Sequence, residues 1–328
     1  MPRIDRLFTR TLKDSRVTPE EAHELIKELK ADDALSPEER TALTDLLATR
    51  GDAFEPGAKT LVTRFLDGGT PLSRGALPDP NLSWDTKGVI SLVTPAGAQL
   101  YVDGIGADDV IQNQLGDCFL LASLSALAAA NPQAIAEAIT DHGDGTFTVR
   151  FFEKQKRGPP TPVEVRVDSD LAAKSDGELL YGQGRDRTEL WPAIIEKAYA
   201  TWKGGYSELA LGGFASDALL AVTGTEAELY NPIQELSSKA TWDLLVTAHA
   251  EGRAMVTGTG AAPGAGYVPM HLYSVVGVRE ENGQKFVTVR NPYGNTEPGR
   301  DGVNDGVFEL TLRQYRQKFE DLFLLQAA

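Results

Sequence analysis

Residues 112–121 read Gln-Asn-Gln-Leu-Gly-Asp-Cys-Phe-Leu-Leu and contain the single cysteine of the 328-residue chain, Cys118. Leucines and alanines follow Cys118 at the spacing of one helical face, which predicts a buried helix over residues 118–130. Gly116 and Asp117 interrupt the chain just before it, so Cys118 is expected at the helix N-terminus. Free backbone N–H groups there favour a thiolate over a thiol and donate to an oxyanion. A lone cysteine in this position is either a small core residue or a nucleophile.

A histidine and an asparagine later in the chain are candidate partners for that thiol. His271 opens an apolar strand-like segment, Asn291 ends the next one, and residues 280–283 between them indicate a hairpin. With a three-residue loop, His271 and Asn291 would be diagonal neighbours on one face; an even loop would separate them unless a bulge intervenes. An asparagine beside an imidazole holds the ring toward a thiol, the Cys–His–Asn division of labour. The alternative for His271 is a structural histidine.

The periodicity of the whole chain predicts an α+β protein. Helices are expected over residues 190–202 and 242–249, and strands over 146–152, 163–167, 271–279 and 285–291, so that a helical half precedes a β half. Residues 1–67 are expected to form short helices, because Thr18 and Ser36 each start a hydroxyl-Pro-Glu-Glu capping pattern. Residues 68–89, rich in Gly, Pro and polar residues, are predicted to link this N-terminal helical region to a catalytic domain over residues 90–328.

Composition narrows the classes of partner. A formal charge of −15 argues against general affinity for nucleic acid or anionic lipid, and leaves proteins, small molecules or divalent cations. No run of about 18 apolar residues occurs, so no membrane span is expected. One cysteine excludes an intramolecular disulfide and multi-cysteine metal sites. The polar start has no signal-like apolar segment, which favours a cytoplasmic location and leaves export by a dedicated machine open.

Several ordered motifs resemble the calpain family of cysteine proteases, over about residues 80–328. The block from Gln112 to Leu121 is similar to the family's Q-x-x-L-G-D-C-W-L-L. The other matching segments are Val102-Asp103-Gly104, ELWPAIIEKAYA at 189–200, HLYSV at 271–275, RNPYG at 290–294 and DGVF at 305–308. Phe119 and Tyr293 stand where the family has tryptophans, and Met270 stands where a glycine usually precedes the histidine.

The resemblance implies a papain-like core with a helical first lobe, about residues 90–230, and a β-rich second lobe, about 231–328. It assigns Cys118 as nucleophile, His271 as general base and acid, Asn291 as orienting residue and Gln112 as oxyanion donor together with the Cys118 amide. Gly212 and Gly213 resemble the glycine pair along which the substrate backbone passes.

Calcium is the cofactor that the resemblance implies, in two sites that align the lobes. The first would use the carbonyls of Val102 and Gly104 with the carboxylates of Asp109 and Glu189. The second site would draw on four residues of the loop after Asn291, namely Glu297, Asp301, Asp305 and the carbonyl of Val303. If both sites are vestigial, the cleft is assembled without calcium.

The sequence therefore predicts a thiol endopeptidase acting on unfolded segments or loops of proteins, with no organic cofactor. A catalytically silent binding module is the first alternative. A transglutaminase-like acyl transferase is the second alternative, although such an enzyme would be expected to have an aspartate at the position of Asn291. Three roles are open for residues 1–67: a pro-segment that covers the cleft, a partner-docking module or a passive appendage.

Overall fold

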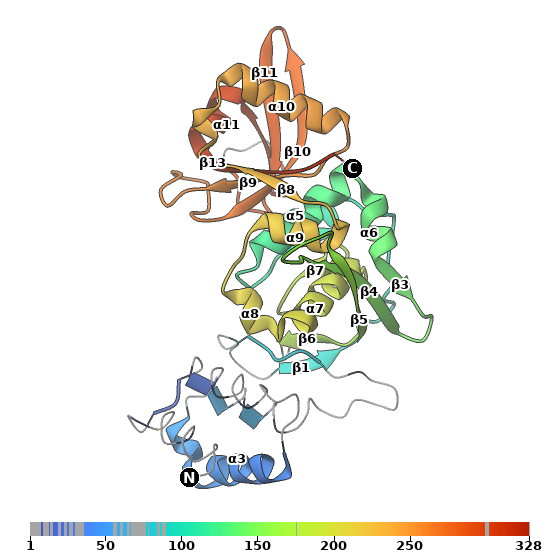
Figure 1. The fold of residues 1–328 in the computed structure, drawn as a ribbon, viewed down its shortest axis with the longest axis vertical. Coiled ribbons are helices and arrows are strands. Elements are labelled where there is room, and N and C mark those ends of the chain that lie inside the picture. Colours follow the sequence, from blue (N-terminus) through green and yellow to red (C-terminus); the bar gives the residue numbers. More distant parts are fainter. Residues whose placement is uncertain are drawn as a thin grey trace.

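The computed structural model describes most of the chain after residue 90 and parts of what precedes it. The described residues are 36–54, 79–83, 90–174, 176–298 and 302–327, with the single or paired positions 8, 13, 16–18, 21, 22, 25, 29, 58, 59, 62, 63, 66, 77 and 86. Three sets of elements follow one another along the chain: an N-terminal helical region, a helical unit (residues 90–224) and a sheet unit (residues 227–327) (Figure 1).

The N-terminal region contains helix α3 (Pro37–Arg50) and the short 3-10 turn η1 (Gly51–Ala53). The predicted capping box at Ser36 is confirmed: its hydroxyl accepts from the Glu39 N–H at 3.2 Å, and the Glu39 carboxylate accepts from the Ser36 N–H at 3.1 Å. The same exchange joins Thr18 and Glu21. Leu43 and Leu46 face a small apolar cluster of this region.

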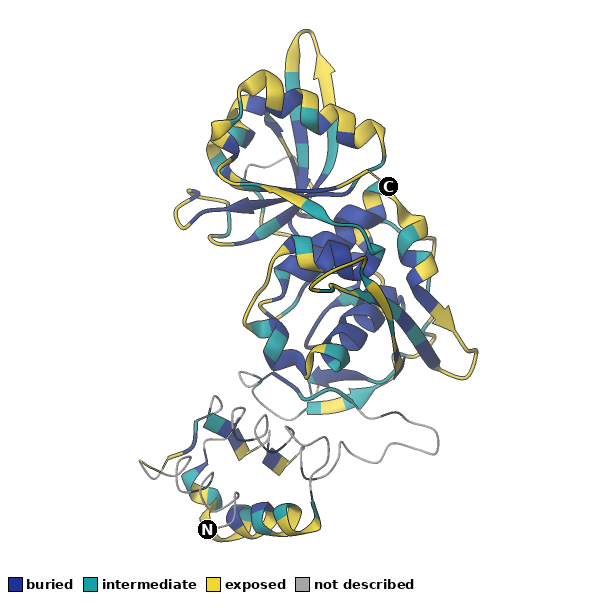
Figure 2. Ribbon diagram, viewed as in Figure 1, coloured by how far each residue is buried: buried dark blue, intermediate teal, exposed yellow. Residues whose placement is uncertain are grey.

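The helical unit is built around one very apolar helix, α5 (Cys118–Ala130), in which every residue from Phe119 to Ala128 is buried (Figure 2). Such a helix has to be covered on all sides. It packs on α9 of its own unit and on β10 of the sheet unit. The helices of the unit are α5, α6 (Pro132–Ala138), α7 (Trp191–Lys203), α8 (Tyr206–Ala210), α9 (Ala215–Thr223) and the 3-10 turn η2 (Ala107–Asp109). Its strands are β1 (Ile90–Val93), β2 (Val110–Ile111), β3 (Ile139–Asp141), β4 (Thr146–Glu153), β5 (Thr161–Asp168), β6 (Leu171–Lys174) and β7 (Gln183–Gly184).

The sheet unit is a six-stranded antiparallel sheet in the order β12-β11-β10-β9-β13-β8. The strands are β8 (Ala227–Tyr230), β9 (Met255–Thr259), β10 (Leu272–Glu281), β11 (Gln284–Arg290), β12 (Val307–Thr311) and β13 (Phe319–Leu325), with helices α10 (Ser238–Ala250) and α11 (Leu312–Lys318) and the turn η3 (Ile233–Glu235). Because β8 pairs with β13, the unit begins at residue 227, slightly before the boundary expected near residue 230.

The β10–β11 hairpin closes differently from the three-residue loop used in the sequence prediction. Glu281 pairs with Gln284, so the loop is the two residues Asn282 and Gly283, both with positive φ as in a type I′ turn. A bulge between Val275 and Gly277 then shifts the register by one residue. The structure thus has the second alternative given above, an even loop with a bulge, and the bulge restores the parity that brings His271 and Asn291 to one face.

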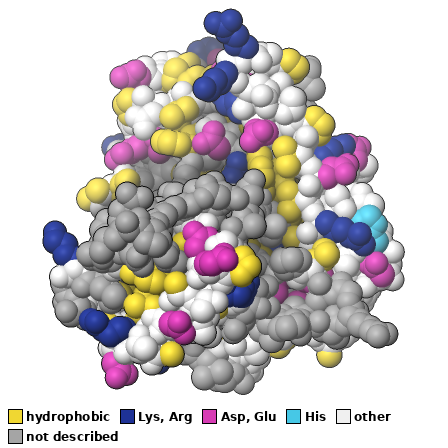
Figure 3. All heavy atoms as spheres, turned by 60° about the horizontal axis from the view of Figure 1, so that its bottom comes forward, with side chains coloured by type: hydrophobic (Ala, Val, Ile, Leu, Met, Phe, Trp, Pro, Cys, Tyr) yellow, Lys and Arg dark blue, Asp and Glu magenta, His cyan; other side chains and the backbone are white. Residues whose placement is uncertain are grey.

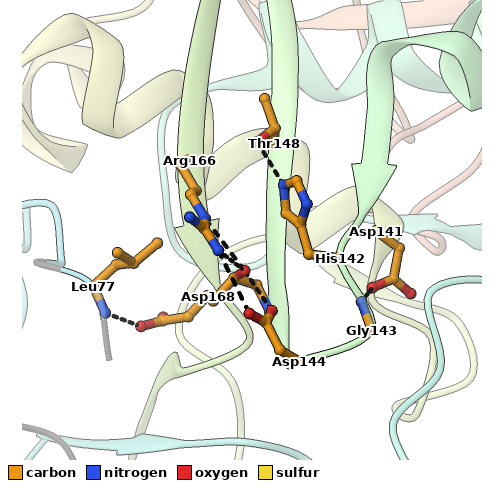
Figure 4. A network of polar contacts seen from close by, with 9 residues as sticks. Leu77, Asp141, His142, Gly143, Asp144, Thr148, Arg166 and Asp168 are labelled. Atoms are coloured by element: carbon orange, nitrogen blue, oxygen red, sulfur yellow. Dashed lines mark hydrogen bonds and ion pairs between the residues drawn. The ribbon is translucent and has the colours of Figure 1, made fainter. Parts of the chain in front are cut away.

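Described residues of the expected linker 68–89 are bound to the helical unit. The Leu77 N–H donates to the Asp168 carboxylate at 2.6 Å (Figure 4). The buried Lys197 pairs with both Asp168 and Asp79, at 2.6 and 2.5 Å. Further along, the Ser83 N–H donates to the Tyr181 hydroxyl at 2.8 Å. These residues therefore belong to the packed surface of the helical unit.

No single helix among the described residues is long and apolar enough to span a membrane. Only α5 and α6 together meet that length and composition, as a pair bent by 117°. On the face shown in Figure 3, acidic and basic side chains are interspersed.

Candidate active site

Cys118 is the first residue of α5, at the boundary between the helical unit and the sheet unit. Its side chain is partly buried, and burial raises the pKa of the thiol to about 11, although the backbone N–H groups of Leu272 and Phe119 donate to the sulfur and oppose this rise. The backbone N–H groups therefore act in the expected direction, toward a thiolate, but desolvation outweighs them. Leu272 belongs to β10 and follows His271, so the sulfur lies against the backbone of the predicted base.

His271 and Asn291 meet at the base of the β10–β11 hairpin, with His271 Nε2 2.9 Å from Asn291 Oδ1. The carboxamide is oriented on both sides, because its Nδ2 donates to the Thr296 carbonyl at 2.9 Å and its Oδ1 also accepts from the Tyr293 N–H at 3.1 Å. An oxygen facing the ring requires the proton on Nε2 and leaves Nδ1 free to accept one. Burial lowers the pKa of His271 to about 4, so the ring is neutral at pH 7.

Two tyrosines cover the imidazole. The Tyr293 ring stacks on His271 with centroids 4.6 Å apart, and the Tyr273 ring meets it edge-on at 5.1 Å. With only 4% of its surface exposed, His271 has little contact with water. Tyr293, which stands where the family has a tryptophan, thus covers one face of the ring.

Gln112 is buried and lies six residues before Cys118 in the sequence. Its Nε2 donates to the Leu115 carbonyl at 2.7 Å and, more weakly, to Asp117 Oδ1 at 3.3 Å. Its backbone N–H donates to the Pro292 carbonyl at 2.7 Å, which ties this residue to the loop beyond Asn291. One amide hydrogen is therefore committed to structure, and the second is held only by a long bond that a stronger acceptor can displace.

A buried pair of carboxyl groups behind Cys118 was missed by the sequence analysis. Asp117 and Glu196 are hydrogen-bonded to each other, and burial raises the pKa of both groups. Asp117 Oδ2 would have no donor next to an ionised Glu196, so the pair holds a proton. The Gly182 N–H donates to the Glu196 oxygens at 2.9 Å. No spacing rule connects residues 117 and 196, which lie on different elements.

The predicted substrate glycines lie over the residue that follows the nucleophile. A Cβ on Gly213 would come within 2.9 Å of the Phe119 ring, and Gly212 has φ +80°. Both glycines also line a cavity of about 340 Å³, whose walls include Tyr199, Trp202 and Phe214. Position 213 therefore has no room for a side chain above the Phe119 ring.

The first predicted calcium site is a cluster of three carboxylates, Asp103, Asp109 and Glu189, whose oxygens lie within 4.8 Å of one another. Asp109 accepts from the Gly106 N–H at 2.6 Å, and Glu189 accepts from the Val102 N–H at 3.1 Å. Burial raises the pKa of Glu189 to about 7, and the charges of Asp109 and Asp103 add to that rise.

Such crowding of oxygen ligands fits a hard divalent cation, which would relieve the repulsion among them. Val102 and Gly104, predicted to give carbonyls, flank Asp103 in the same loop, and Gly104 has φ +120°. Asp103 itself was missed, although its place inside the V-D-G triplet was a usable signal.

The second predicted calcium site lies only partly within the described residues. Glu297 accepts from the Gly306 N–H at 3.0 Å, and Asp305 accepts from the Val307 N–H at 3.0 Å. Val303 is exposed, and Asp301 lies outside the described residues. The one group of three metal-binding side chains found among the described residues is that of Asp103.

Comparison with known proteins shows which family these motifs come from. The family model described as "Calpain family cysteine protease" matches residues 53–302. The chain is 33% identical over 211 residues to the calpain-type cysteine protease DEK1 of Zea mays, covering 60% of this chain and 9% of that protein.

Two animal proteins match over more of the chain. The identity is 30% over 282 residues to calpain clp-1 of Caenorhabditis elegans, covering 80% of this chain and 34% of that protein. It is 30% over 309 residues to the human calpain-2 catalytic subunit, covering 84% and 41%. The chain thus spans at most about two fifths of the length of these relatives.

Proposed function

Because the chain belongs to the calpain family of cysteine proteases, we propose that it hydrolyses peptide bonds in proteins, with Cys118 as nucleophile and His271 as general base and acid. Asn291 holds the ring. The observation that carries this proposal is the 2.9 Å bond from His271 to Asn291, beside a Leu272 amide that donates to the Cys118 sulfur. The helical and sheet units are then the two lobes of a papain-like fold.

The reaction begins when Nδ1 of the neutral His271 takes the proton of the Cys118 thiol. The sulfur attacks the peptide carbonyl carbon, and the oxyanion accepts from the Cys118 N–H and from Gln112 Nε2. The imidazolium then protonates the leaving amine, and an acyl-enzyme remains. Water, deprotonated by the same ring, attacks the thioester and releases the carboxylic acid and the thiol. Because the pKa directions favour a neutral thiol and imidazole, the first proton transfer accompanies substrate binding.

The substrate in this proposal is an extended protein segment. Its backbone passes over Gly212 and Gly213, where a Cβ on Gly213 would collide with Phe119. Unfolded regions and loops supply such extended backbone, whereas folded elements do not.

Calcium is proposed to bind at Asp103, Asp109 and Glu189, together with the carbonyls of Val102 and Gly104. The support is the close approach of three carboxylates and the raised pKa of Glu189. A bound cation would neutralise the negative charge of this cluster and fix the position of the loop that leads into β2. The loop with Glu297, Val303 and Asp305 remains a weaker prediction for a second site.

One assay tests both nucleophile and cation: hydrolysis of an unfolded casein by wild type and Cys118→Ala, across a titration from EGTA to millimolar calcium. Hydrolysis that needs Cys118 supports the protease, and a calcium-dependent rate that Asp109→Asn shifts supports the site. A folded wild-type protein whose Cys118 does not react with a peptidyl thiol probe would instead favour a silent binding module. Incorporation of an amine without hydrolysis would favour an acyl transferase.

A further inference from the structure

Arg290 is the last residue of β11, directly before Asn291, and only 1% of its surface is exposed. Burial lowers the pKa of its guanidinium to about 10, so it stays charged at neutral pH. None of the ion pairs among the described residues includes Arg290. A buried cation of this kind must be held by hydrogen bonds to other groups.

All the acceptors of Arg290 lie in the helical unit. Its Nη2 donates to the Val110 carbonyl at 2.7 Å and to the Asp108 carbonyl at 3.1 Å. Its Nη1 lies 3.3 Å from the Ser125 hydroxyl, which itself donates to the Ala107 carbonyl at 2.8 Å. Ser125 is on α5, two turns after Cys118.

The segment that Arg290 holds includes Asp109 of the acidic cluster. The Asp109 carbonyl accepts from the Arg185 N–H at 2.7 Å, so three consecutive carbonyls, of residues 108 to 110, are all engaged. The segment therefore has little freedom to move without moving its donors.

Asn291 is bracketed by bonds to this same stretch of chain. Before it, the Arg290 side chain reaches Val110; after it, the Pro292 carbonyl accepts from the Gln112 N–H at 2.7 Å. A Cβ on Gly294 would lie 2.3 Å from the Ile111 side chain, so the turn after Asn291 is also packed closely on β2.

From these contacts we propose that Arg290 is a positioning residue that couples the acidic cluster of Asp103, Asp109 and Glu189 to the His271–Asn291 pair. A change in the segment 108–110 is passed through the guanidinium to the residue that orients the catalytic ring. The inference rests on the proposed function for the role of His271. Coupling of this kind is a property of two sites measured together, so it is tested by a double-mutant cycle.

The measured quantity is the rate at which iodoacetamide alkylates Cys118, the only cysteine of the chain. This rate responds to the placement of the strand start at His271, because the N–H of the next residue, Leu272, donates to the sulfur. The cycle combines Arg290→Lys, which keeps the charge but loses the forked donor, with Asp109→Asn. We expect each single variant to change the rate, and the double variant to differ at least about threefold from the product of the two single effects. Independent, multiplicative effects would overturn the proposal.

Two matched controls separate coupling from loss of structure. Arg279→Gln removes an exposed arginine from the same hairpin, and combined with Asp109→Asn it should show multiplicative effects. Each variant is checked by thermal unfolding. Where Arg290→Lys or Asp109→Asn does not fold, Ser125→Ala and Asp103→Asn take their places. Because alkylation needs no peptide hydrolysis, failure of the protease assay would not affect this result.

Discussion

Ser274 and Ala122 join the two units directly: the Ser274 hydroxyl donates to the Ala122 carbonyl at 2.8 Å, in a buried position. Ser274 lies three residues after His271 on β10, and Ala122 lies four residues after Cys118 on α5. The bond therefore fixes the strand that bears the base against the helix that bears the nucleophile.

We expect Ser274→Ala to lower the free energy of unfolding by about 1 kcal/mol, the usual net value of one hydrogen bond. It should also lower kcat, because the strand then moves more freely relative to Cys118, while KM changes little. Urea unfolding and steady-state kinetics on a casein substrate measure both. Ser91→Ala, on an exposed position of β1, is the control. A loss of stability with unchanged kcat would show that this bond does not set the alignment.

Replacing the base should cost more than replacing its orienting partner. His271→Ala is expected to lower kcat by about 10²–10⁴-fold, the usual contribution of general acid–base catalysis. Asn291→Ala should cost less, because Tyr293 and Tyr273 still hold the ring. Steady-state kinetics with the active-site concentration determined by thiol titration compares the two. Equal losses would mean that Asn291 alone orients the imidazole.

The reactivity of Cys118 should rise steeply with pH. With the thiol pKa raised to about 11 and the imidazole neutral, deprotonation proceeds as pH increases. The alkylation rate of the substrate-free protein is therefore expected to grow about tenfold per pH unit between pH 7 and 9. Alkylation reactions quenched at successive times and analysed by mass spectrometry give the dependence of the rate on pH. A flat rate over that range would reveal a preformed thiolate–imidazolium pair instead.

Gly213→Ala should impair substrate binding through Phe119. The new Cβ would lie 2.9 Å from the ring, so either the ring or the loop must shift. We expect KM to rise and kcat to fall. In the double variant Gly213→Ala/Phe119→Leu, the smaller leucine leaves room for the new Cβ at position 213. This variant should therefore recover part of the lost kcat/KM. If the second change brings no recovery, the collision with Phe119 is not the cause.

The Asp117–Glu196 pair predicts how stability depends on pH. Burial raises the pKa of both groups above the unfolded values, so the folded protein holds a proton that the unfolded chain releases, and stability falls as pH rises above about 4.5. Glu196→Gln keeps a donor for Asp117 and has no proton to lose. It should therefore lose less stability than wild type between pH 5 and 8, as measured by urea unfolding. The exposed Glu164→Gln should behave like wild type.

Much of the site was predictable because its residues lie in strong local patterns. The apolar run after Cys118 permits only a buried helix, and the strand-turn-strand pattern places His271 near Asn291. Gly277, a glycine inside an apolar strand pattern, was a signal for a bulge, but the sequence alone does not tell whether the register shifts there. The pairing of His271 with Asn291 arises from the other alternative that the sequence left open, an even loop with a bulge.

Properties that depend on packing escaped the sequence for a different reason. The pKa of Cys118 depends on how far the sheet unit covers the start of α5, and this outweighs the local effect of the helix N-terminus. Glu196 and Arg290 meet their partners across different elements, at separations that no periodicity links. Their burial, and not their spacing, marks them as important.

The contacts of the segment before Ile90 affect how this protein should be shortened for study. The Tyr181 hydroxyl accepts from the Ser83 N–H and shares a hydrogen bond with the Thr86 hydroxyl, and the Tyr206 N–H donates to the Asn81 carbonyl. The rings of Tyr181 and Tyr206 stack on each other with centroids 3.9 Å apart. A recombinant fragment that starts at residue 90 would remove these hydrogen-bond partners from both tyrosines. A stable fragment should therefore start upstream of Leu77, whose N–H donates to the Asp168 carboxylate.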